Sequence, residues 1–543
     1  MKISPLVFQS RRSPVIGRGG MVASTQPLAT AAGLTILENG GNAADAAVAV
    51  AAALNVTEPG MTGIGGDAFA LFYEKKDRKV YALNGSGRAP SGLSLERLKK
   101  EGFREELPPK HPYTITVPGA CAAWCDTVER FGCLSMADVL QPAIELAEKG
   151  FPVAPLTSVS WGKSAAGLCE SLNGKELTLS GRGPQPGEIF RNPGLAKTFQ
   201  SVAEGGKQAY YQGDIADGII AIIKEAGGCM QLTDLANHQS TWEEPISVNY
   251  RGVRIWECPP NGQGLAALLA LNLLKGFDLT ELRALSPQRM HLLIEAMRIG
   301  FADARQYVAD PVFSPAPLNE LLSDAYAEER RKLIDLDRAN PDVKYGTPPA
   351  SSDTVYFSVV DAQGNACSFI NSNYMGFGTG IVPRGWGFSL QNRGHNFSLD
   401  AQHPNALAPG KRPYHTIIPA MATYEDDQSL YASFGVMGGF NQPQGHMQVV
   451  VGMVDDELDP QSALDRPRFC IEIEGAGGKV AMEEGFEFQT LANLAEKGHI
   501  VRPVSGFVRG IVGRGQIIRR DPENDVLWAG SDPRADGCAM CLH

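Results

Sequence analysis

The residue with the clearest potential for chemistry is a threonine two-thirds of the way along the chain. Residues 351–366 read SSDTVYFSVVDAQGNA, so Thr354 stands between Asp353 and a β-type run. A threonine hydroxyl is a weak nucleophile unless a base lies beside it, and a free α-amine, with a pKa of about 7.7–8.0, can be that base. Thr354 acquires such an amine only if the Asp353–Thr354 bond is cut. The ordinary alternative is a β-hairpin that turns at Gly364 and Asn365.

Thr354 can make this cut itself. Its hydroxyl can attack the preceding carbonyl carbon, which gives an ester that water then hydrolyses. Other nucleophile signatures are missing, because the sequence contains no G-x-S-x-G, no Walker loop and no H-E-x-x-H. The sequence therefore leaves a choice: Thr354 begins a strand, or it begins a second polypeptide.

Two patterns resemble parts of metal sites. His291 and Glu295 are four residues apart in a helical segment, yet no further histidine or carboxylate follows at ligand spacing. Cys538 and Cys541 form a lone C-x-x-C at the C-terminus, without a second pair or a βα context. We therefore predict a core-packed helix, an incidental tail, and neither a metal nor a cofactor.

Composition narrows the class of protein and of partner. The 543 residues carry a formal net charge of −11, and no basic run with interleaved aromatics occurs, which argues against nucleic-acid binding. The most apolar stretch, residues 43–56, is too short to span a membrane and contains Asp45. The N-terminus lacks the apolar segment of a secretory signal, and ten cysteines lie at irregular spacing. We expect a soluble cytoplasmic protein that binds neither nucleic acid nor membrane.

The pattern of elements changes along the chain. Helix and strand signals alternate in the first 150 residues, residues 134–350 are mostly helical, and short β-type segments follow Thr354. This order predicts a layered α/β protein with a break at Asp353/Thr354. The clearest predicted helices are 27–39, 43–55, 136–150 and 287–308, and the clearest predicted strands are 68–73, 79–84, 355–360, 366–371, 412–424 and 430–436.

Several segments in a fixed order resemble the γ-glutamyltransferase family. The stretch DTVYFSVVDAQGNACSF is similar to the family's processing site, roughly T-T-H-x-S-V-V-D followed by G-N-A. Residues 20–69 resemble the family's N-terminal signature. Further similar landmarks follow along nearly the whole chain: TVPGACAAW, LQPAIELAEKGF, YYQGDIA, EAMRIGFADAR, FGTGIV, GKRP and GVMGGF.

The resemblance implies an N-terminal-nucleophile hydrolase fold. This is an α/β fold, a four-layer αββα sandwich in which two stacked sheets lie between helical layers. The resemblance also implies a proenzyme that cleaves itself into a large chain, residues 1–353, and a small chain, residues 354–543. The two chains would stay together as a heterodimer and form one globular unit.

The resemblance also assigns the catalytic groups. Thr354 is implied to be both the autoprocessing residue and the nucleophile, with Asp353 before the cut. Gly438 and Gly439 match the pair whose backbone N–H groups form the family's oxyanion hole; glycine lets such donors approach freely, and each is worth about 3 kcal/mol. Ser372 falls where the family has a hydroxyl that hydrogen-bonds the nucleophile, although an ordinary strand serine explains it equally well.

The positions that bind substrate in the family differ here. The family arginine that binds the α-carboxylate aligns with Ser86; Arg88, two residues further on, either takes the same role or caps a loop. The Asn, Gln and Asp that hold the α-amino and α-carboxylate groups align with Tyr374, Arg393 and Asn396. These changes resemble the divergent, signal-less, glutathione hydrolase-like branch of the family.

Further changes alter the charge of the expected pocket. A pair of serines after K-R-P, which also binds the carboxylate, becomes His415 and Thr416. Asn396 can accept a hydrogen bond from a substrate ammonium group, but without the charge of the family's aspartate. Arg393 suits a carboxylate and repels an ammonium, unless it is a solvated loop arginine. The segment between Asn396 and Gly410 is shorter than a family lid, which indicates an open site.

Three functions remain open at this point. The first is a self-processed amidase that forms an acyl-Thr354 ester from a small γ-glutamyl amide such as glutathione and passes the acyl group to water or an amine. The second keeps this mechanism for a carboxylate-bearing amide without an α-amine, such as an oxamate or a glutaryl amide of the cephalosporin acylase type. The third is an unprocessed, non-catalytic pseudoenzyme, because Val355 and Tyr356 replace the family's usual Thr and His after the nucleophile.

Overall fold

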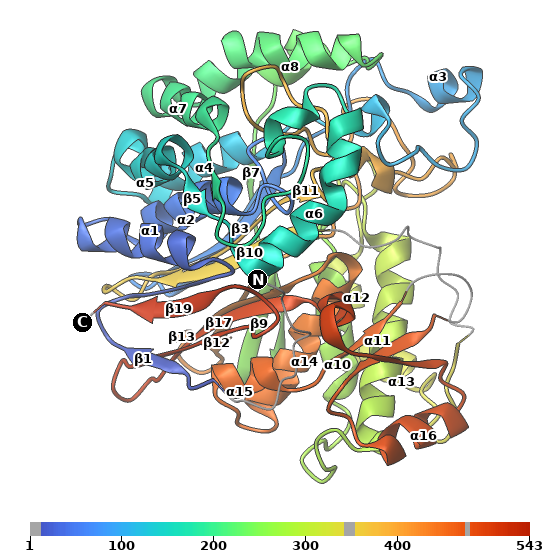
Figure 1. The fold of residues 1–543 in the computed structure, drawn as a ribbon. Helices are drawn as coiled ribbons and strands as arrows, with labels where there is room; N and C mark the ends of the chain where they lie inside the picture. The colour runs from blue at the N-terminus through green and yellow to red at the C-terminus, as the bar shows by residue number, and fades with distance from the viewer. Residues whose placement is uncertain (1–11, 342–352, 473–477, 543) are drawn as a thin grey trace.

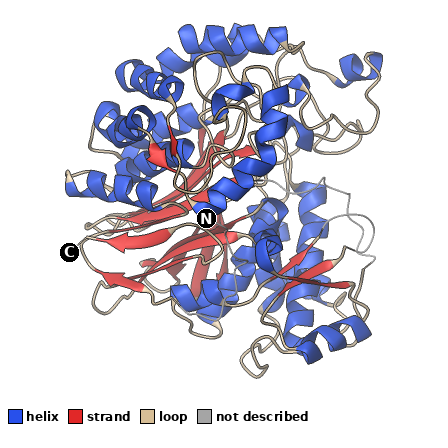
Figure 2. Ribbon diagram, viewed as in Figure 1, coloured by secondary structure: helices blue, strands red, loops and turns tan. Residues whose placement is uncertain are grey.

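Two seven-stranded sheets, stacked face to face, form the centre of the protein (Figure 1, Figure 2). The computed structural model describes residues 12–341, 353–472 and 478–542. In order across the sheet, the first sheet consists of β19 (Cys538–Cys541), β2 (Met21–Ser24), β10 (Asp353–Val360), β11 (Ala366–Tyr374), β3 (Asp67–Glu74), β4 (Lys79–Gly85) and β7 (Thr241–Glu243). The second consists of β1 (Val15–Gly17), β18 (Leu527–Ser531), β17 (Arg514–Arg520), β13 (Leu430–Met437), β12 (Ala420–Tyr424), β9 (Val253–Glu257) and β8 (Ile246–Tyr250).

The hairpin predicted at the threonine is confirmed. β10 and β11 pair antiparallel, and the turn between them contains Gly364, whose φ of +86° is a left-handed conformation that glycine adopts at little cost. On its other side β10 pairs with β2, but only over Ser358–Val360. Among the described residues, the first half of β10, with Thr354, therefore has a partner strand on one side only.

One helical layer covers the outer face of the first sheet (Figure 1). Its innermost helix, α2, is buried along its whole length, as expected for a helix that is apolar nearly all round. Asp45, the one charge of this segment, belongs to a capping box with Asn42 at the N-terminus of the helix. The helices of this layer are α1 (Pro27–Glu38), α2 (Ala43–Thr57), α4 (Ala120–Phe131), α5 (Met136–Lys149), α6 (Pro155–Glu170), α7 (Pro193–Tyr211) and α8 (Asp214–Glu225).

A second helical layer covers the outer face of the second sheet, and a separate apolar core fills the space between the two sheets. That inner core joins Phe69 and Ile370 of the first sheet to Met421 and Ile518 of the second. The four-layer αββα sandwich is therefore confirmed. The second layer contains α10 (Gly264–Leu274), α11 (Pro287–Tyr307), α13 (Asp324–Arg331), α14 (Gln442–Val454), α15 (Pro460–Asp465) and α16 (Phe488–Glu496).

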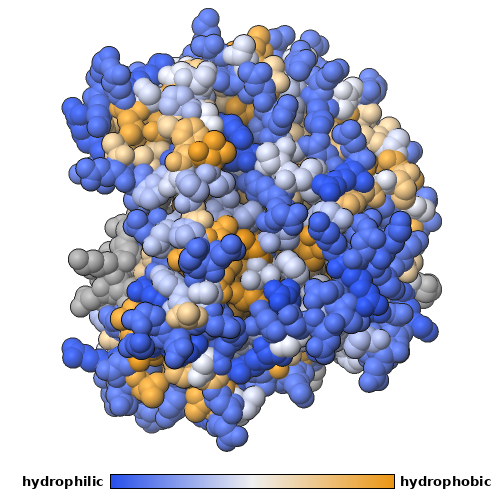
Figure 3. All heavy atoms as spheres, turned by 180° about the vertical axis from the view of Figure 1, so that it is seen from behind, coloured by the Kyte–Doolittle hydropathy of each residue, from blue (hydrophilic) through white to orange (hydrophobic). Residues whose placement is uncertain are grey.

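Smaller elements complete the described chain. None of the described helices combines the length and the apolar character that a membrane span requires. The face in Figure 3 is largely hydrophilic, and its apolar side chains lie in separate groups. The smaller elements are α3 (Leu95–Lys100), α9 (Leu232–Ala236), α12 (Leu318–Leu321), the two-stranded sheet of β5 (Phe151–Pro152) and β6 (Ile189–Phe190), and the three-stranded sheet of β14 (Phe469–Ile471), β15 (Val480–Glu483) and β16 (Val501–Val504).

The structure corrects three expectations from the sequence. Residues 134–350, expected to be mostly helical, also supply β7, β8 and β9, strands of only three to five residues. The strand expected at 412–424 is confined to Ala420–Tyr424, because the backbone N–H groups of Arg412, Tyr414 and His415 donate to loop residues instead. The C-terminal C-x-x-C is not an incidental tail but forms β19, at the edge of the first sheet.

Candidate active site

Thr354 lies at an irregularity at the start of β10. The register of the β10–β11 pairing shifts between Asp353 and Val355, and such a bulge redirects the side chain within it. The Thr354 side chain is completely buried, and its Oγ1 lies 3.1 Å from Oγ of Ser372 on the adjacent strand. The predicted contact between these two hydroxyl groups is therefore present in the structure.

Ser372 connects Thr354 to a buried arginine. The backbone N–H of Tyr374 donates to Oγ of Ser372 at 2.9 Å, and Nη2 of Arg393 donates to the same oxygen at 3.3 Å. A hydroxyl oxygen has two lone pairs, so these two donors direct the hydroxyl proton of Ser372 elsewhere. Oγ1 of Thr354 is an acceptor within reach, and this arrangement orients the threonine hydroxyl.

Arg393 is the central cation of the site. It is wholly buried, which rules out the solvated loop arginine considered from the sequence. Nη1 donates to Oγ1 of Thr416 at 2.7 Å, and the guanidinium lies 4.3 Å from the ring centroid of Tyr374. Burial lowers the pKa of Arg393 to about 10, so it still carries its charge at neutral pH. Its Nε has no hydrogen-bond partner in the part of the chain that the structure describes.

The carboxylate whose charge acts on Arg393 belongs to Asp67, a residue that the sequence pattern did not single out. Its Oδ1 accepts hydrogen bonds from the backbone N–H of Gly87 and Gly119 and from Nε2 of Gln391, at 2.9, 3.2 and 2.9 Å. Its Oδ2 lies 3.0 Å from Nε2 of His415. Burial raises the pKa of Asp67, but the hydrogen bond from His415, the charge of Arg393 and the hydrogen bond from Gln391 together lower it below its ordinary value. The carboxylate is thus ionised and already occupied by donors.

The imidazole of His415 is neutral and donates a hydrogen bond to the carboxylate of Asp67. Burial, and then the charge of Arg393, lower the pKa of His415 to about 3. The neutral ring donates from Nε2 to Asp67, while its Nδ1 accepts from the backbone N–H of Ile417 at 3.4 Å. His415 is therefore part of the site through its hydrogen bond to Asp67.

Tyr374 and Asn396 are fixed to each other. The hydroxyl of Tyr374 donates to Oδ1 of Asn396 at 2.5 Å, and Nδ2 of Asn396 donates to the carbonyl oxygen of Tyr414 at 3.1 Å. Tyr374 adopts a left-handed conformation, with φ of +79°. Tyr374, whose ring packs against the guanidinium of Arg393, therefore links Asn396 to that arginine.

The glycine pair forms the turn from β13 into α14. Gly438 and Gly439 have φ of +140° and +59°, which strongly disfavour any side chain at these positions. Nε2 of Gln263 donates to the carbonyl oxygens of both Gly439 and Thr416, at 2.8 and 2.6 Å. Gln263 therefore ties the glycine turn to the segment that contacts Arg393.

Arg88 is the one predicted residue that stays apart from this network. Its carbonyl oxygen accepts from the backbone N–H of Val117 at 3.0 Å, which holds its loop beside Asp67. Its half-buried side chain acts electrostatically on Arg412 and His238. Its role in substrate binding stays a prediction.

Sequence reasoning missed Asp67, Gln263 and Gln391. A signal for Asp67 was present, because it directly follows the glycine-rich run T-G-I-G-G and is the first residue of β3. No local sequence pattern pointed to the two glutamines as site residues. Their importance comes from contacts with residues that are distant in sequence.

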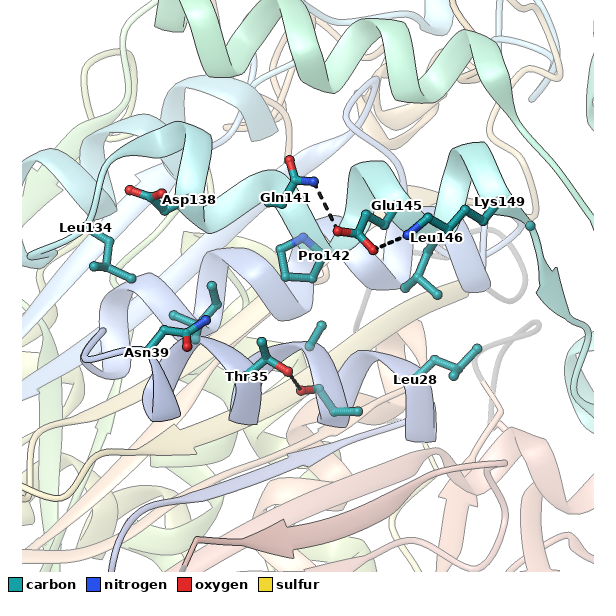
Figure 4. A pocket seen from close by; sticks show the side chains of 14 residues that line it. Leu28, Thr35, Asn39, Leu134, Asp138, Gln141, Pro142, Glu145, Leu146 and Lys149 are labelled. Carbon is teal, nitrogen blue, oxygen red and sulfur yellow. Dashed lines mark hydrogen bonds and ion pairs between the residues drawn. The ribbon is translucent and has the colours of Figure 1, made fainter.

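A groove with a volume of about 770 Å³ lies elsewhere, between α1 and α5 (Figure 4). Its rim carries Gln141, Glu145 and Lys149, joined by hydrogen bonds, and its floor is mainly apolar. None of its lining residues belongs to the Thr354 network. We assign it no part in the chemistry.

Comparison with known proteins shows which family the chain belongs to. A sequence model described as Gamma-glutamyltranspeptidase matches residues 29–542. The chain belongs to this family. The Glutathione hydrolase-like YwrD proenzyme of Bacillus subtilis (strain 168) is 37% identical to it over 534 residues, which cover 97% of this chain and 99% of the relative.

Other members of the γ-glutamyltranspeptidase family carry different names. The Oxamate amidohydrolase proenzyme of Klebsiella pneumoniae is 31% identical, with 96% of this chain and 98% of the relative covered. The cephalosporin acylase from Bacillus halodurans, known from a crystal structure, is 44% identical in sequence to this chain. The two structures superpose with a TM-score of 0.91 over 100% of both chains. The chain is therefore an enzyme, an amidohydrolase or acyltransferase with the N-terminal-nucleophile hydrolase fold.

Proposed function

We propose that Thr354 is both the residue that cuts the chain and the nucleophile of the resulting amidase. In the cut, Oγ1 attacks the carbonyl carbon of Asp353, the acyl group moves from nitrogen to oxygen, and water hydrolyses the ester. The products are chains of residues 1–353 and 354–543. The buried position of Thr354 and its contact with Ser372 support this proposal, as does the word proenzyme in the names of the relatives.

The freed amine then serves catalysis. It takes the proton of the Thr354 hydroxyl as Oγ1 attacks the substrate amide, and it returns this proton to the departing amine. The backbone N–H groups of Gly438 and Gly439 stabilise the oxyanion. The acyl-Thr354 ester that remains passes its acyl group to water or to an amine. No cofactor takes part in this sequence.

We propose a substrate whose acyl group carries a carboxylate but no ammonium group. The observation that carries this proposal is Arg393, a buried cation two hydrogen bonds from Oγ1 of Thr354. Asp67, the carboxylate whose charge acts on it, is already occupied by four donors and is a poor partner for an ammonium group. Short oxamate-type and glutaryl amides fit this description.

A γ-glutamyl amide such as glutathione is the second candidate. The relative that is 37% identical, the Glutathione hydrolase-like YwrD proenzyme, favours it by its name. In this case Asn396, a neutral acceptor, would have to receive the ammonium group close to the charge of Arg393. The geometry supports this candidate less well.

A denaturing gel of the wild type and of Thr354→Ala tests whether Thr354 cuts the chain. The wild-type chain is expected to replace its 58.2 kDa band by two smaller bands on a denaturing gel, whereas Thr354→Ala keeps the single band. Thr354→Ser, which retains a hydroxyl, should cut slowly. A Thr354→Ala chain that still splits at residue 353 would rule out self-cleavage, and an uncut wild type would favour a pseudoenzyme.

Two chromogenic substrates test the acyl group. We expect a glutaryl anilide to be hydrolysed with a higher kcat/KM than the matching γ-glutamyl anilide, because only the latter brings an ammonium group towards Arg393. The two substrates differ only in that group. Preference for the γ-glutamyl compound would establish the glutathione-type activity instead.

A further inference from the structure

A second group of buried polar side chains lies in the helical layer of the second sheet. His291 and Glu295 are one turn apart on α11 and point to the same side of the helix. His499 follows α16 and meets them there, although it is far away in sequence. All three side chains are at least 97% buried, and one ligand atom from each lies within 4.8 Å of the others.

The hydrogen bonds fix the tautomers of both imidazoles. Nε2 of His291 lies 2.7 Å from the carbonyl oxygen of Asp335, so this nitrogen must carry a proton and donate it. In the neutral ring Nδ1 of His291 is then an acceptor, and Nε2 of His499, at 2.7 Å, is its donor. Consequently Nδ1 of His499 carries no proton, and its lone pair can accept a hydrogen bond or bind a cation.

This lone pair faces another acceptor. Nδ1 of His499 lies 4.0 Å from Oε1 of Glu295 and has no hydrogen-bond partner in the described part of the chain. A buried lone pair opposite a carboxylate oxygen is unfavourable unless a positive species lies between the two. Two bonds of about 2.0–2.2 Å, the lengths for Zn²⁺ with nitrogen and oxygen ligands, span a separation of this size.

The surroundings hold the three side chains in place. Glu295 accepts from Nη1 of Arg298 at 3.0 Å and from the backbone N–H of Asn340 at 2.9 Å. The backbone N–H of Ala339 donates to the carbonyl oxygen of Lys497 at 2.8 Å, which joins the segment before the processing site to the one that carries His499. A histidine that donates its second N–H to a carbonyl, as His291 does, has the usual outer support of a metal ligand.

We propose that His291, Glu295 and His499 bind a divalent cation of the zinc class. Two imidazoles and one carboxylate suit such a cation, whereas Mg²⁺ and Ca²⁺ prefer oxygen ligands. Binding exchanges the His291–His499 hydrogen bond for bonds to the metal and draws the ligand atoms together. The helix α11 is core-packed, as the sequence predicted, and no local pattern pointed to a third ligand because His499 lies far along the chain.

The cation would join segments on both sides of the processing site. His291 and Glu295 precede Thr354 in the chain, and His499 follows it. If the chain is cut as proposed, the bound metal cross-links the two products. This role rests on the proposed cleavage; the binding of the metal does not, and the uncut Thr354→Ala chain should bind it equally well.

Metal content tests the site directly. The full chain is produced in medium supplemented with Zn²⁺ or Co²⁺, passed through a desalting column with EDTA, and analysed by mass spectrometry for metal. We expect one cation per chain in the wild type and a loss of at least tenfold in His499→Asn. His111→Asn is the matched control, because asparagine also suits the helix-capping position of His111, and it should keep the metal.

A spectrum of the cobalt form makes the test independent of the variants. Nitrogen and oxygen ligation gives visible bands without the thiolate-to-cobalt absorption that the chain's cysteines would produce. Glu295→Gln, which preserves size and an acceptor for Asn340, should lower the metal content as well. A metal-free wild type, a thiolate spectrum, or full retention by a folded His499→Asn chain would overturn the proposal.

Discussion

Two buried regions of the molecule hold arginines in opposite ways. Beside the three-stranded sheet, Asp532 accepts from Nη2 of Arg468 at 2.7 Å and from Nη1 of Arg534 at 3.0 Å, and Arg534 also donates to Glu483 at 2.5 and 2.6 Å. In the site, Arg393 donates to two hydroxyl groups and packs on a tyrosine ring. A fully paired buried charge supports the fold, while the buried charge of Arg393, which has no carboxylate partner among its hydrogen bonds, is the one that we propose binds an anionic substrate.

The largest expected effect comes from breaking the paired network. Asp532→Ala leaves the charges of Arg468 and Arg534 without their shared partner, and such a loss costs about 3–5 kcal/mol of unfolding free energy. Urea unfolding followed by circular dichroism measures this cost. A loss below about 1 kcal/mol would mean that the network contributes little and that the contrast with Arg393 is unfounded.

Removing the unpaired charge should affect catalysis more than stability. Arg393→Met replaces a buried cation by an apolar side chain, which removes the cost of holding an unpaired charge away from water, so folding should suffer less than in Asp532→Ala. Loss of a charged hydrogen bond to the substrate costs about 1.5–3 kcal/mol, so kcat/KM for the glutaryl anilide should fall by about 10–150-fold.

The control for Arg393→Met is a substrate without a carboxylate. Hydrolysis of a butyryl anilide should change little in this variant, once a gel has established that the variant is cut normally. An equal loss with both substrates would show that Arg393 acts through Ser372 rather than on the substrate carboxylate.

The two regions should also respond to acid in separate ranges of pH. The folded-state pKa of His415, about 3, lies below its ordinary value of 6.5, so the unfolded chain takes up the proton first. The stability that neutral His415 contributes is complete above pH 6.5 and is lost as the pH falls towards 3. His415→Asn should therefore reduce the slope of unfolding free energy against pH by up to about 1.4 kcal/mol per pH unit.

Asp532 supplies the contrast in the same experiment. Although burial raises its pKa, the charges of Arg468 and Arg534 lower the pKa of Asp532 to about 2, so its contribution is complete above its ordinary value of 3.8 and is lost only below it. Between pH 4.5 and 6.5, Asp532→Ala should shift the stability curve without changing its slope. Parallel curves for wild type and His415→Asn would refute the assignment of a neutral buried histidine.

The smallest effect is expected at an exposed ion pair. Glu487 pairs with Arg283 at 2.8 Å, but both side chains are more than 60% exposed. Glu487→Ala should leave the urea midpoint of unfolding nearly unchanged, because solvent and salt screen such pairs. A loss as large as that of Asp532→Ala would remove burial as the explanation for the difference.

The sequence predicted the parts of the site that follow from local pattern and ordered motifs. The contact between Thr354 and Ser372 was expected from the resemblance to the family, and the structure allows it because the two residues lie on paired strands of one hairpin. Asp67 was missed since its four donors come from separate segments that no spacing rule connects. The same reason explains why the partnership of His291 with His499 was not recognised.

The position of β10 inside the first sheet has a consequence for whether an unfolded molecule can fold again. Its neighbours are β2, from before the proposed processing site, and β11, from after it. An uncut chain can reach this arrangement alone, whereas two separated pieces would have to find each other in solution before the sheet could form again. If the chain is cut as proposed, heating that unfolds the enzyme once should therefore inactivate it. The fraction of activity recovered on cooling should fall as the protein is diluted.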